Sequence, residues 1–230
     1  MQVTQWLAAL NTKVVKMRIE NEILLETKEL RKYFTGKKGL FNMNPPVVKA
    51  VDDINLVIRK GETLGLVGES GCGKSMSAMS VLNLIPKTAK IISGEILFDG
   101  ENLLNKSQKE MQSIRGGKIA LIPQDPMTSL NPLYTVGDQL LEVIKIHQGL
   151  SGKEAYNKAI EAFEAVKIPA AESRLKNYPH EFSGGMKQRA IIAMALATNA
   201  QILIADEPTT ALDVTIHYCP AVKHLKSRDI

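Results

Sequence analysis

The stretch Gly68-Glu69-Ser70-Gly71-Cys72-Gly73-Lys74-Ser75 matches the pattern G-x-x-x-x-G-K-[ST] of a phosphate-binding loop. A short apolar run, residues 63–67, leads directly into it as a predicted strand, and residues 74–84 follow with apolar side chains at helical spacing. In such a loop the glycines let consecutive backbone N–H groups turn toward phosphate oxygens, and the N-terminus of the helix adds its partial positive charge. The stretch therefore predicts a nucleotide-binding domain of the α/β class.

Two side chains of this loop have predicted roles in binding a nucleotide. Lys74 would neutralise the β- and γ-phosphates, and the Ser75 hydroxyl would take one coordination position on Mg²⁺. The alternative is a glycine turn that matches by chance. Cys72 lies among exposed amides beside Lys74, which should favour its thiolate, so we expect alkylation of this thiol to block nucleotide binding. An inert small residue that the loop tolerates is the alternative for Cys72.

An acidic pair follows the apolar run of residues 202–205. Asp206 could hold the magnesium ion through a water molecule, while Glu207 could act as general base on the attacking water. An Asp-Glu-Pro sequence can also be an ordinary turn at the end of a strand. Together with the glycine loop, however, the pair predicts hydrolysis of the nucleotide.

A second glycine-rich helix start, Ser183-Gly184-Gly185-Met186, lies shortly before the acidic strand. A hydroxyl and bare amides at a helix N-terminus form a second site for phosphate, which the chain's own phosphate loop does not explain. Simple N-capping by Ser183 is the alternative. Two anion sites and one nucleotide loop indicate that two subunits pair around the nucleotide.

The composition fits a globular chain that works in a reducing compartment. It has 230 residues, 44% of them hydrophobic and 23% charged, and only two cysteines, too few for a disulfide framework. No apolar run approaches the ~20 residues that cross a membrane, and residues 1–16 lack the pattern of a secretory signal. A net charge of +5 with only 5% aromatic residues argues against nucleic acid as a partner. We expect a cytoplasmic protein whose membrane role comes through a partner.

Hydrophobic periodicity divides the chain into a core and an insertion. Strands are predicted at residues 24–34 and 47–58 as an antiparallel entry sheet, then at 94–98, 119–122 and 201–205. Helices are predicted at residues 136–147, 151–166 and 184–198. Ser107 and Glu110 form a capping box that opens a further short helix, and Ser151 and Glu154 form a second box that opens the helix at 151–166. The predicted units are an extension at 1–23, a core at 24–126 and 183–216, a helical subdomain at 127–182 and an atypical tail at 217–230.

These motifs, in this order, resemble the ATP-binding subunits of ABC transporters over residues 24–216. The phosphate loop, Gln124 as lid glutamine, residues 183–189 as signature, the acidic pair and Ala211-Leu212-Asp213 as D-loop all match. Met186 replaces the more common glutamine, and with residues 124–132 and 205–215 this resembles the oligopeptide/dipeptide importers, of which nickel importers are close relatives. The resemblance implies a P-loop NTPase (RecA-like) core with an antiparallel β subdomain and an inserted α-helical subdomain.

The resemblance also implies partners and further site residues. Two subunits, identical or similar, would close head to tail, with each ATP between one chain's Lys74 and the other chain's Ser183. They would drive transmembrane permease subunits from the cytoplasmic face of the membrane, with an extracytoplasmic binding protein acting indirectly. Gln124 would sense the γ-phosphate and magnesium. Tyr33 is at the position where this family places an aromatic under adenine, and the adjacent Phe34, which points to the other face, is the alternative.

The resulting expected site is as follows: catalytic, Glu207, Gln124 and Lys74; ATP-binding, Tyr33, Gly68, Glu69, Ser70, Gly71, Cys72, Gly73, Lys74, Ser75, Met76, Ser183, Gly184 and Gly185; magnesium-binding, Ser75, Gln124 and Asp206.

After Ile216 the sequence no longer resembles the family. None of the four histidines, His147, His180, His217 and His224, occupies the place of the family's switch histidine, and we expect all four to lie at the surface. A frameshift or premature stop near His217 would explain the change, and we expect missing core strands, low stability and slow or no hydrolysis. The alternatives are a non-catalytic nucleotide-binding fragment, or an ABC-type ATPase acting on DNA or ribosomes, which the short helical block disfavours.

Overall fold

The computed structural model describes residues 22–35, 47–84, 89–125 and 128–206. The elements in chain order are β1 (Ile23–Thr35), β2 (Val47–Arg59), α2 (Lys74–Val81), β3 (Ala89–Phe98), β4 (Glu101–Asn102), η1 (Leu103–Asn105), α3 (Gln108–Ile114), β5 (Ile119–Ile122), α4 (Val136–Gln148), α5 (Gly152–Ala165), α6 (Ala171–Arg174), η2 (Pro179–Glu181), α7 (Gly184–Ala197) and β6 (Ile202–Ala205). No helix within these ranges has both the length and the apolar character needed to cross a membrane.

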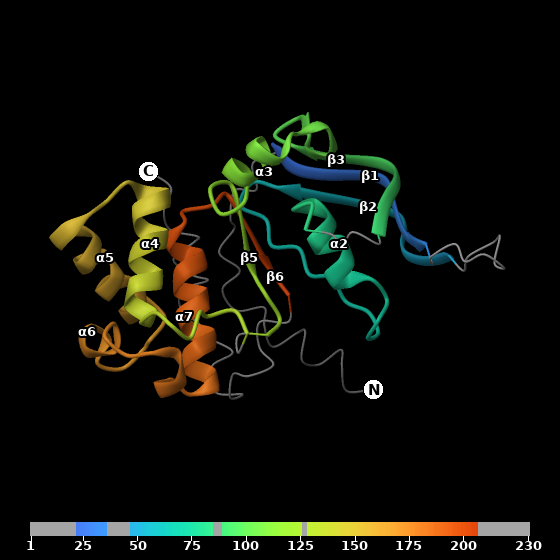
Figure 1. Ribbon diagram of the computed structural model, residues 1–230. Helices are drawn as coiled ribbons and strands as arrows, with labels where there is room; N and C mark the ends of the chain where they lie inside the picture. Colours follow the sequence, from blue (N-terminus) through green and yellow to red (C-terminus); the bar gives the residue numbers. More distant parts are fainter. Residues whose placement is uncertain (1–21, 36–46, 85–88, 126–127, 207–230) are drawn as a thin grey trace, which may run out of the picture.

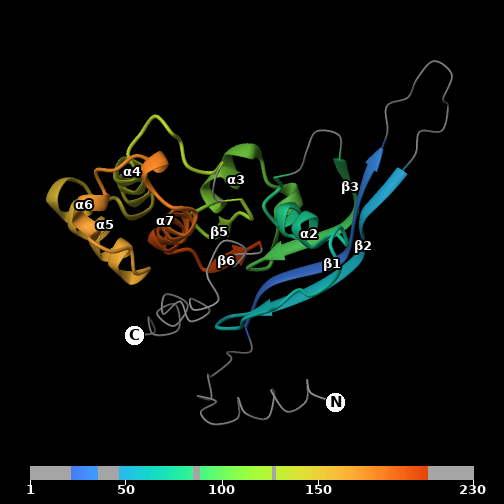
Figure 2. The ribbon, with the colours of Figure 1, turned by 90° about the horizontal axis from the view of Figure 1, so that it is seen from below.

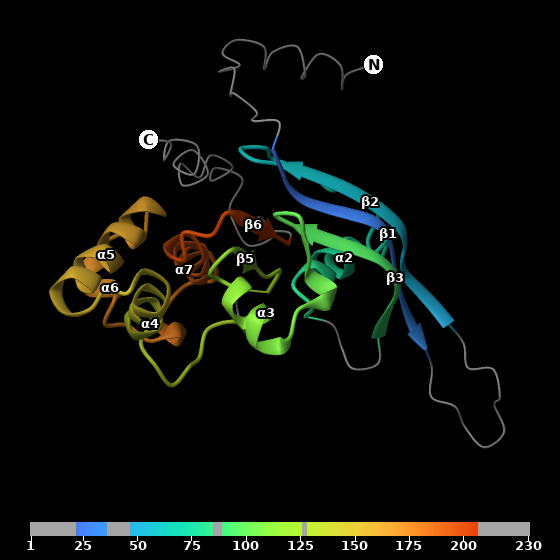
Figure 3. The ribbon, with the colours of Figure 1, turned by 90° about the horizontal axis from the view of Figure 1, so that it is seen from above.

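The antiparallel entry sheet is confirmed, with the strand order β2-β1-β3-β4. β1 pairs with β2 from Ile23↔Arg59 to Thr35↔Val47 and with β3 from Leu25↔Phe98 to Phe34↔Ala89, both antiparallel. Figures 1 and 3 show this sheet at one end of the molecule, with α2 beneath it. A long two-strand ribbon therefore covers the helix that follows the phosphate loop.

A parallel pair of strands, β5 and β6, lies between α2 on one side and the helical block of α4 to α7 on the other (Figures 1 and 2). The ladder runs from Ile119↔Ile202 to Ile122↔Ala205. Both strands are short apolar runs, as expected for parallel strands that are covered on both faces. Their carboxyl ends lie side by side because the Asp206 amide donates to the Ile122 carbonyl at 3.0 Å.

The strand predicted at residues 63–67 does not form, which corrects the sequence analysis. Residues 62–69 have no regular secondary structure, and Leu64, Leu66 and Val67 are 40%, 45% and 98% exposed. A strand needs an adjacent backbone to complete its ladder. Among the described residues no backbone pairs with this segment, so its apolar pattern has no ladder to join.

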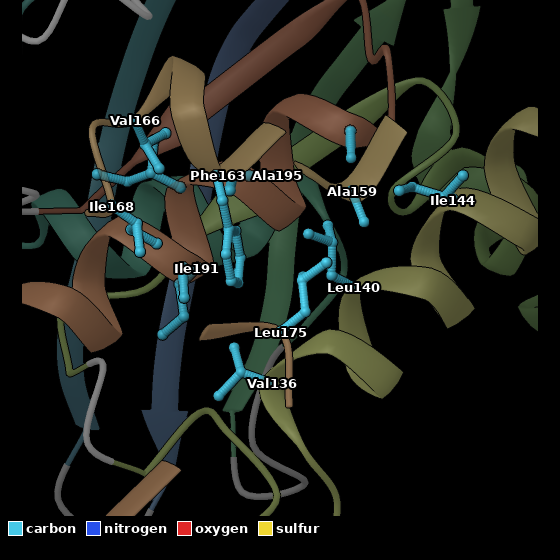
Figure 4. Close-up of a cluster of buried hydrophobic side chains, with 14 of the residues drawn as sticks. Val136, Leu140, Ile144, Ala159, Phe163, Val166, Ile168, Leu175, Ile191 and Ala195 are labelled. Carbon is cyan, nitrogen blue, oxygen red and sulfur yellow. The ribbon is translucent and has the colours of Figure 1, made fainter. Parts of the chain in front are cut away.

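The helical block has its own hydrophobic cluster, part of which is drawn in Figure 4. Val136, Leu140 and Ile144 from α4 meet Phe163 from α5, and all four are completely or almost completely buried. The Phe163 ring contacts Phe182 edge-on, with ring centroids 6.4 Å apart. Because the cluster continues into α7 and β5, the block is packed against the parallel strands.

A second cluster joins the antiparallel sheet to the nucleotide-loop helix. It combines Leu30 and Val51 from the sheet with Val81 from α2, Met111 from α3 and Ile202 from β6. Arg115 strengthens this junction, because its Nε donates to the Leu82 carbonyl at 2.8 Å and its Nη2 to the Asn83 carbonyl at 3.1 Å. The C-terminal end of α2 is thereby tied to the turn before β5.

The capping predictions have mixed outcomes. The Ser107/Glu110 capping box is present, whereas Ser151 is an N-cap without a side-chain hydrogen bond, so the second box was wrong. His180 is exposed as expected, but His147 is half-buried. A Cβ on Gly116 would approach the His147 ring to 2.8 Å, so the ring lies against that turn instead of projecting into solvent.

Candidate functional site

The phosphate loop has a backbone that only glycine can adopt at Gly73. This residue is the N-cap of α2 and has φ 95°, in the left-handed region. A Cβ there would also lie 2.3 Å from the carbonyl oxygen of Ala50 in β2. The loop is thus pressed against the antiparallel sheet, and a side chain at Gly73 would displace it.

Lys74 folds back over the loop. Its Nζ donates to the carbonyl oxygens of Gly68 and Glu69, both at 2.8 Å, and lies 3.7 Å from the Cys72 Sγ. Cys72 is exposed. The ammonium is therefore held at the mouth of the loop, where it would meet the oxygens of a bound phosphate chain.

The hydroxyl of Ser75 donates to Oδ1 of Asp206 at 2.9 Å. This contact joins residues 131 positions apart in the sequence and brings the phosphate loop to the carboxyl end of β6. A hydroxyl and one carboxylate are oxygen ligands of the kind that Mg²⁺ accepts alongside waters and substrate phosphates. The pair therefore fits a magnesium ion shared with a nucleotide.

The first turn of α2 supplies the amides for an anion. The Ser77 amide makes the first intrahelical bond, to the Gly73 carbonyl at 2.8 Å, so the amides of Lys74, Ser75 and Met76 precede it. The Met76 side chain packs against the second hydrophobic cluster. The Met76 amide, at the open start of α2, is therefore the group of this residue that is placed for a ligand.

The second predicted phosphate site lies apart from the first. Ser183 caps α7, its Oγ accepting from the Met186 amide at 3.3 Å, and Ser183 and Gly184 are exposed. Figures 1 and 2 place α7 on the opposite side of β5 and β6 from α2. The structure therefore does not bring Ser183, Gly184 and Gly185 to this chain's own phosphate loop. Gln124 is exposed two residues beyond β5.

Tyr33 and Phe34 point to opposite faces of β1. The Tyr33 hydroxyl donates to Oδ1 of Asp52 at 2.6 Å, and the Lys49 Nζ lies 5.5 Å from the ring centroid. The bond to Asp52 raises the Tyr33 pKa and lowers that of Asp52. Phe34 shares its face with the buried Lys32, because alternate residues of a strand project to the same side.

Lys32 is a feature that the sequence analysis missed. Its side chain is fully buried, its Nζ has no hydrogen-bond partner among the described residues, and it lies 5.9 Å from the Phe34 ring centroid. Burial lowers its pKa from 10.5 to about 8. The sequence gives one sign that Lys32 is buried. It alternates with Leu30 and Phe34 along the strand, so all three side chains are expected on the same, inward face.

Several predicted residues lie outside the described ranges. These are Glu207, the D-loop residues 211–213, and the histidines His217 and His224. Their predicted roles stay predictions.

Comparison with known proteins finds relatives over most of the chain. The family model "ABC transporter" matches residues 51–210. A probable peptide ABC transporter ATP-binding protein, y4tR, from Sinorhizobium fredii is 52% identical over 196 residues. The oligopeptide transport ATP-binding protein OppD from Salmonella typhimurium is 48% identical over 194, and the dipeptide transport ATP-binding protein DppD from Bacillus subtilis 49% over 196. The matches cover 84–85% of this chain but 56% of each relative, so the chain spans about half the length of these relatives.

Solved structures agree on the fold. A dimeric post-hydrolysis state of the ATP-binding cassette MJ0796, bound to ADP and Pi, superimposes with a TM-score of 0.75 at 29% identity, over 89% of this chain and 83% of that one. A further dimeric structure of MJ0796 gives 0.74. The antiparallel sheet, the phosphate loop and the helical block therefore form the P-loop NTPase fold of an ATP-binding cassette.

Proposed function

The chain belongs to the ABC transporter family, and on that premise we propose that it is an ATP-binding subunit that couples ATP binding and hydrolysis to the import of oligopeptides or dipeptides. The observation that carries the proposal is the 2.9 Å contact between Ser75 and Asp206. It joins the phosphate loop to the end of the acidic strand, where a P-loop ATPase needs its magnesium ligands. The peptide substrate is suggested by the printed names of the relatives.

The residues of the nucleotide site each have a task in this proposal. The amides at the start of α2 hold the phosphate chain, and the Lys74 ammonium neutralises its charge. Ser75 and Asp206 would hold Mg²⁺, which neutralises charge on the phosphate oxygens when bound. Glu207 is the proposed general base on the attacking water. Gln124 is proposed to respond to the γ-phosphate.

The signature residues are proposed to act on a second subunit's nucleotide. Ser183 and Gly184 are exposed at the start of α7, away from this chain's own phosphate loop. A capped helix start is a good anion site, so a partner's ATP is the ligand that it fits. The dimeric cassette among the similar structures supports this assembly. Permease subunits are the further proposed partners, contacted at the cytoplasmic face of the membrane.

Binding and turnover by the purified chain test the proposal separately. Lys74→Ala should weaken MgATP binding at least tenfold, measured by calorimetry, whereas the exposed Lys153 on α5 is a matched control whose change to alanine should have no effect. Glu207→Gln should retain binding and abolish hydrolysis. Binding without any turnover in the unaltered chain would instead support the non-catalytic alternative. Equal affinity in the Lys74→Ala and Lys153→Ala variants would overturn the nucleotide site.

The transported substrate is tested in membranes. Reconstitution with a permease pair and its binding protein should give peptide uptake that depends on ATP and is lost in Glu207→Gln. Uptake of nickel and not of peptides under the same conditions would favour the nickel importer alternative.

A further inference from the structure

Lys32 carries a positive charge into the interior beneath the antiparallel sheet. Its side chain is completely buried, and its Nζ forms no hydrogen bond with any residue that the structure describes. The acidic residues of β2, Asp52 and Asp53, are exposed and take part in pairs at the surface. Residues 36–46 and 85–88, which adjoin this part of the sheet along the chain, contain no Asp or Glu. Neither carboxylate of β2 is therefore placed to neutralise the buried ammonium.

The register of the sheet places Lys32 behind the phosphate loop. Lys32 lies opposite Val51 of β2. The carbonyl oxygen of Ala50, the residue before Val51, leaves no room for a Cβ on Gly73, which is the N-cap of α2. Opposed residues in antiparallel strands have Cα atoms about 5 Å apart, and successive residues lie about 3.4 Å apart along the strand. The backbone of Lys32 is therefore on the order of 10 Å from the helix start that would face a phosphate chain.

The Lys32 side chain lies on the face of the sheet toward α2. It alternates along β1 with Leu30, and both side chains are completely buried. Leu30 packs in the hydrophobic cluster that includes Val81 of α2. Figures 1 and 3 show α2 beneath this sheet. The Lys32 charge and the start of α2 are therefore on the same side of the sheet, with protein instead of water around the ammonium.

A buried charge in this place attracts a bound anion more strongly than an exposed one. At an effective dielectric constant of about 20, unit charges about 10 Å apart attract each other enough to change a binding constant on the order of tenfold. Salt weakens the attraction between exposed charges at this distance, but acts much less on buried ones. Burial lowers the Lys32 pKa to about 8, so the side chain remains mostly protonated at pH 7. An anion at the loop would thus compensate part of the cost of burying this ammonium.

We propose that the buried charge of Lys32 strengthens the binding of a nucleotide's phosphate chain to the loop at residues 68–75, without touching the ligand. The inference rests on the nucleotide site of the proposed function and adds to it a residue outside the glycine motif. The charge acts on the phosphates and not on the base, so its effect depends on the charge of the ligand. It also gives the unfavourable burial of an unpaired ammonium a role in binding.

Affinities for ligands of different charge test this inference on the purified 230-residue chain. Calorimetry at pH 7 should show that Lys32→Met binds MgATP about tenfold more weakly than the unaltered chain, and that the loss is smaller for MgADP, which has one phosphate fewer. Magnesium tripolyphosphate has no base or sugar, and its affinity should fall as much as that of MgATP. A role of Lys32 in packing alone would not make the loss depend on the charge of the ligand.

Lys28→Met is the matched control, because Lys28 lies on the same strand and is exposed. It should change the affinity for MgATP by less than about twofold, since water and salt screen its charge. Raising the KCl concentration from about 0.1 M to about 0.5 M should change the ratio between the affinities of the unaltered chain and Lys32→Met by less than about twofold, because burial protects that attraction from salt. Urea unfolding establishes that both variants are folded.

The results that would contradict the inference are distinct from those that would contradict the nucleotide site. Equal affinities of the unaltered chain and Lys32→Met for MgATP overturn the inference and leave the nucleotide site in place. A loss that is absent for tripolyphosphate overturns it too, because the effect would then lie at the base. So does a loss of equal size in Lys28→Met, or a loss that disappears at high salt. An unaltered chain that does not bind MgATP would overturn the nucleotide site itself, and this inference with it.

Discussion

Replacing Lys32 by methionine should stabilise the protein at neutral pH. Lys32 is fully buried, and no described group pairs with its ammonium. Burial lowers its pKa from 10.5 to about 8. Since one pKa unit corresponds to about 1.4 kcal/mol, keeping the proton on this side chain in the folded state costs about 3 kcal/mol. Methionine has a similar shape and no charge, so it fits the same space.

Part of the stability gained in Lys32→Met is offset by the loss of a favourable contact that the lysine makes. The ammonium lies 5.9 Å from the Phe34 ring centroid, and a cation–π contact of this kind contributes about 1 kcal/mol. We therefore expect Lys32→Met to raise the free energy of unfolding by about 2 kcal/mol at pH 7. For a chain of this size that corresponds to a midpoint about 4–8 °C higher.

The pH dependence gives the prediction a second test. At pH 7 the lysine is protonated in both folded and unfolded chains, so the full cost is present. As the pH rises above about 8, the folded chain loses this proton first, while the unfolded chain keeps it until about 10.5. The unaltered protein therefore gains stability over this window, and the advantage of Lys32→Met shrinks.

Urea unfolding at pH 7 and pH 9.5 measures both effects. Lys28→Met on the same strand is a matched control, because Lys28 is exposed and its ion pair with Glu26 lies at the surface. It should change stability by less than about 0.5 kcal/mol. A Lys32→Met variant that is no more stable than the unaltered protein at pH 7, or whose advantage is the same at pH 9.5, would refute the reasoning.

Three further predictions concern the caps and the nucleotide site. Ser107→Ala removes the hydroxyl that accepts from the Glu110 amide and should lower the free energy of unfolding by about 1 kcal/mol in urea, an unchanged value contradicting the cap's role. In a Cys219→Ser background, alkylation of the exposed Cys72 by N-ethylmaleimide should block nucleotide binding and be slowed by saturating MgATP; equal rates with and without MgATP would count against the loop as the binding site. Tyr33→Ala should weaken ATP binding about tenfold and Phe34→Ala much less, since Phe34 lies on the same face of β1 as the buried Lys32 whereas the Tyr33 hydroxyl reaches the exposed Asp52; the reverse order would show that Phe34 stacks on the base.

Much of the architecture follows from local pattern. The loop at residues 68–75, the apolar strands at 119–122 and 202–205 and the helix cap at Ser183 are found where the sequence predicts them, because glycine geometry, apolar runs and hydroxyl caps act over a few residues. The helical block follows equally from 3.6-residue periodicity. Met76 shows where prediction from local sequence stops. Its place in the motif predicts that the residue lies near the ligand, but not whether its side chain or its backbone amide faces the ligand.

The sequence by itself therefore determined the family, the phosphate loop and the order of the elements, since each depends on residues adjacent along the chain. Only the tertiary structure decided which distant groups meet. It brought Ser75 to Asp206, turned Tyr33 away from Phe34, buried Lys32 and left residues 63–67 without a ladder. The physical reason is that pairing, burial and charge depend on neighbours supplied by other segments, and no local pattern specifies whether those neighbours are in place.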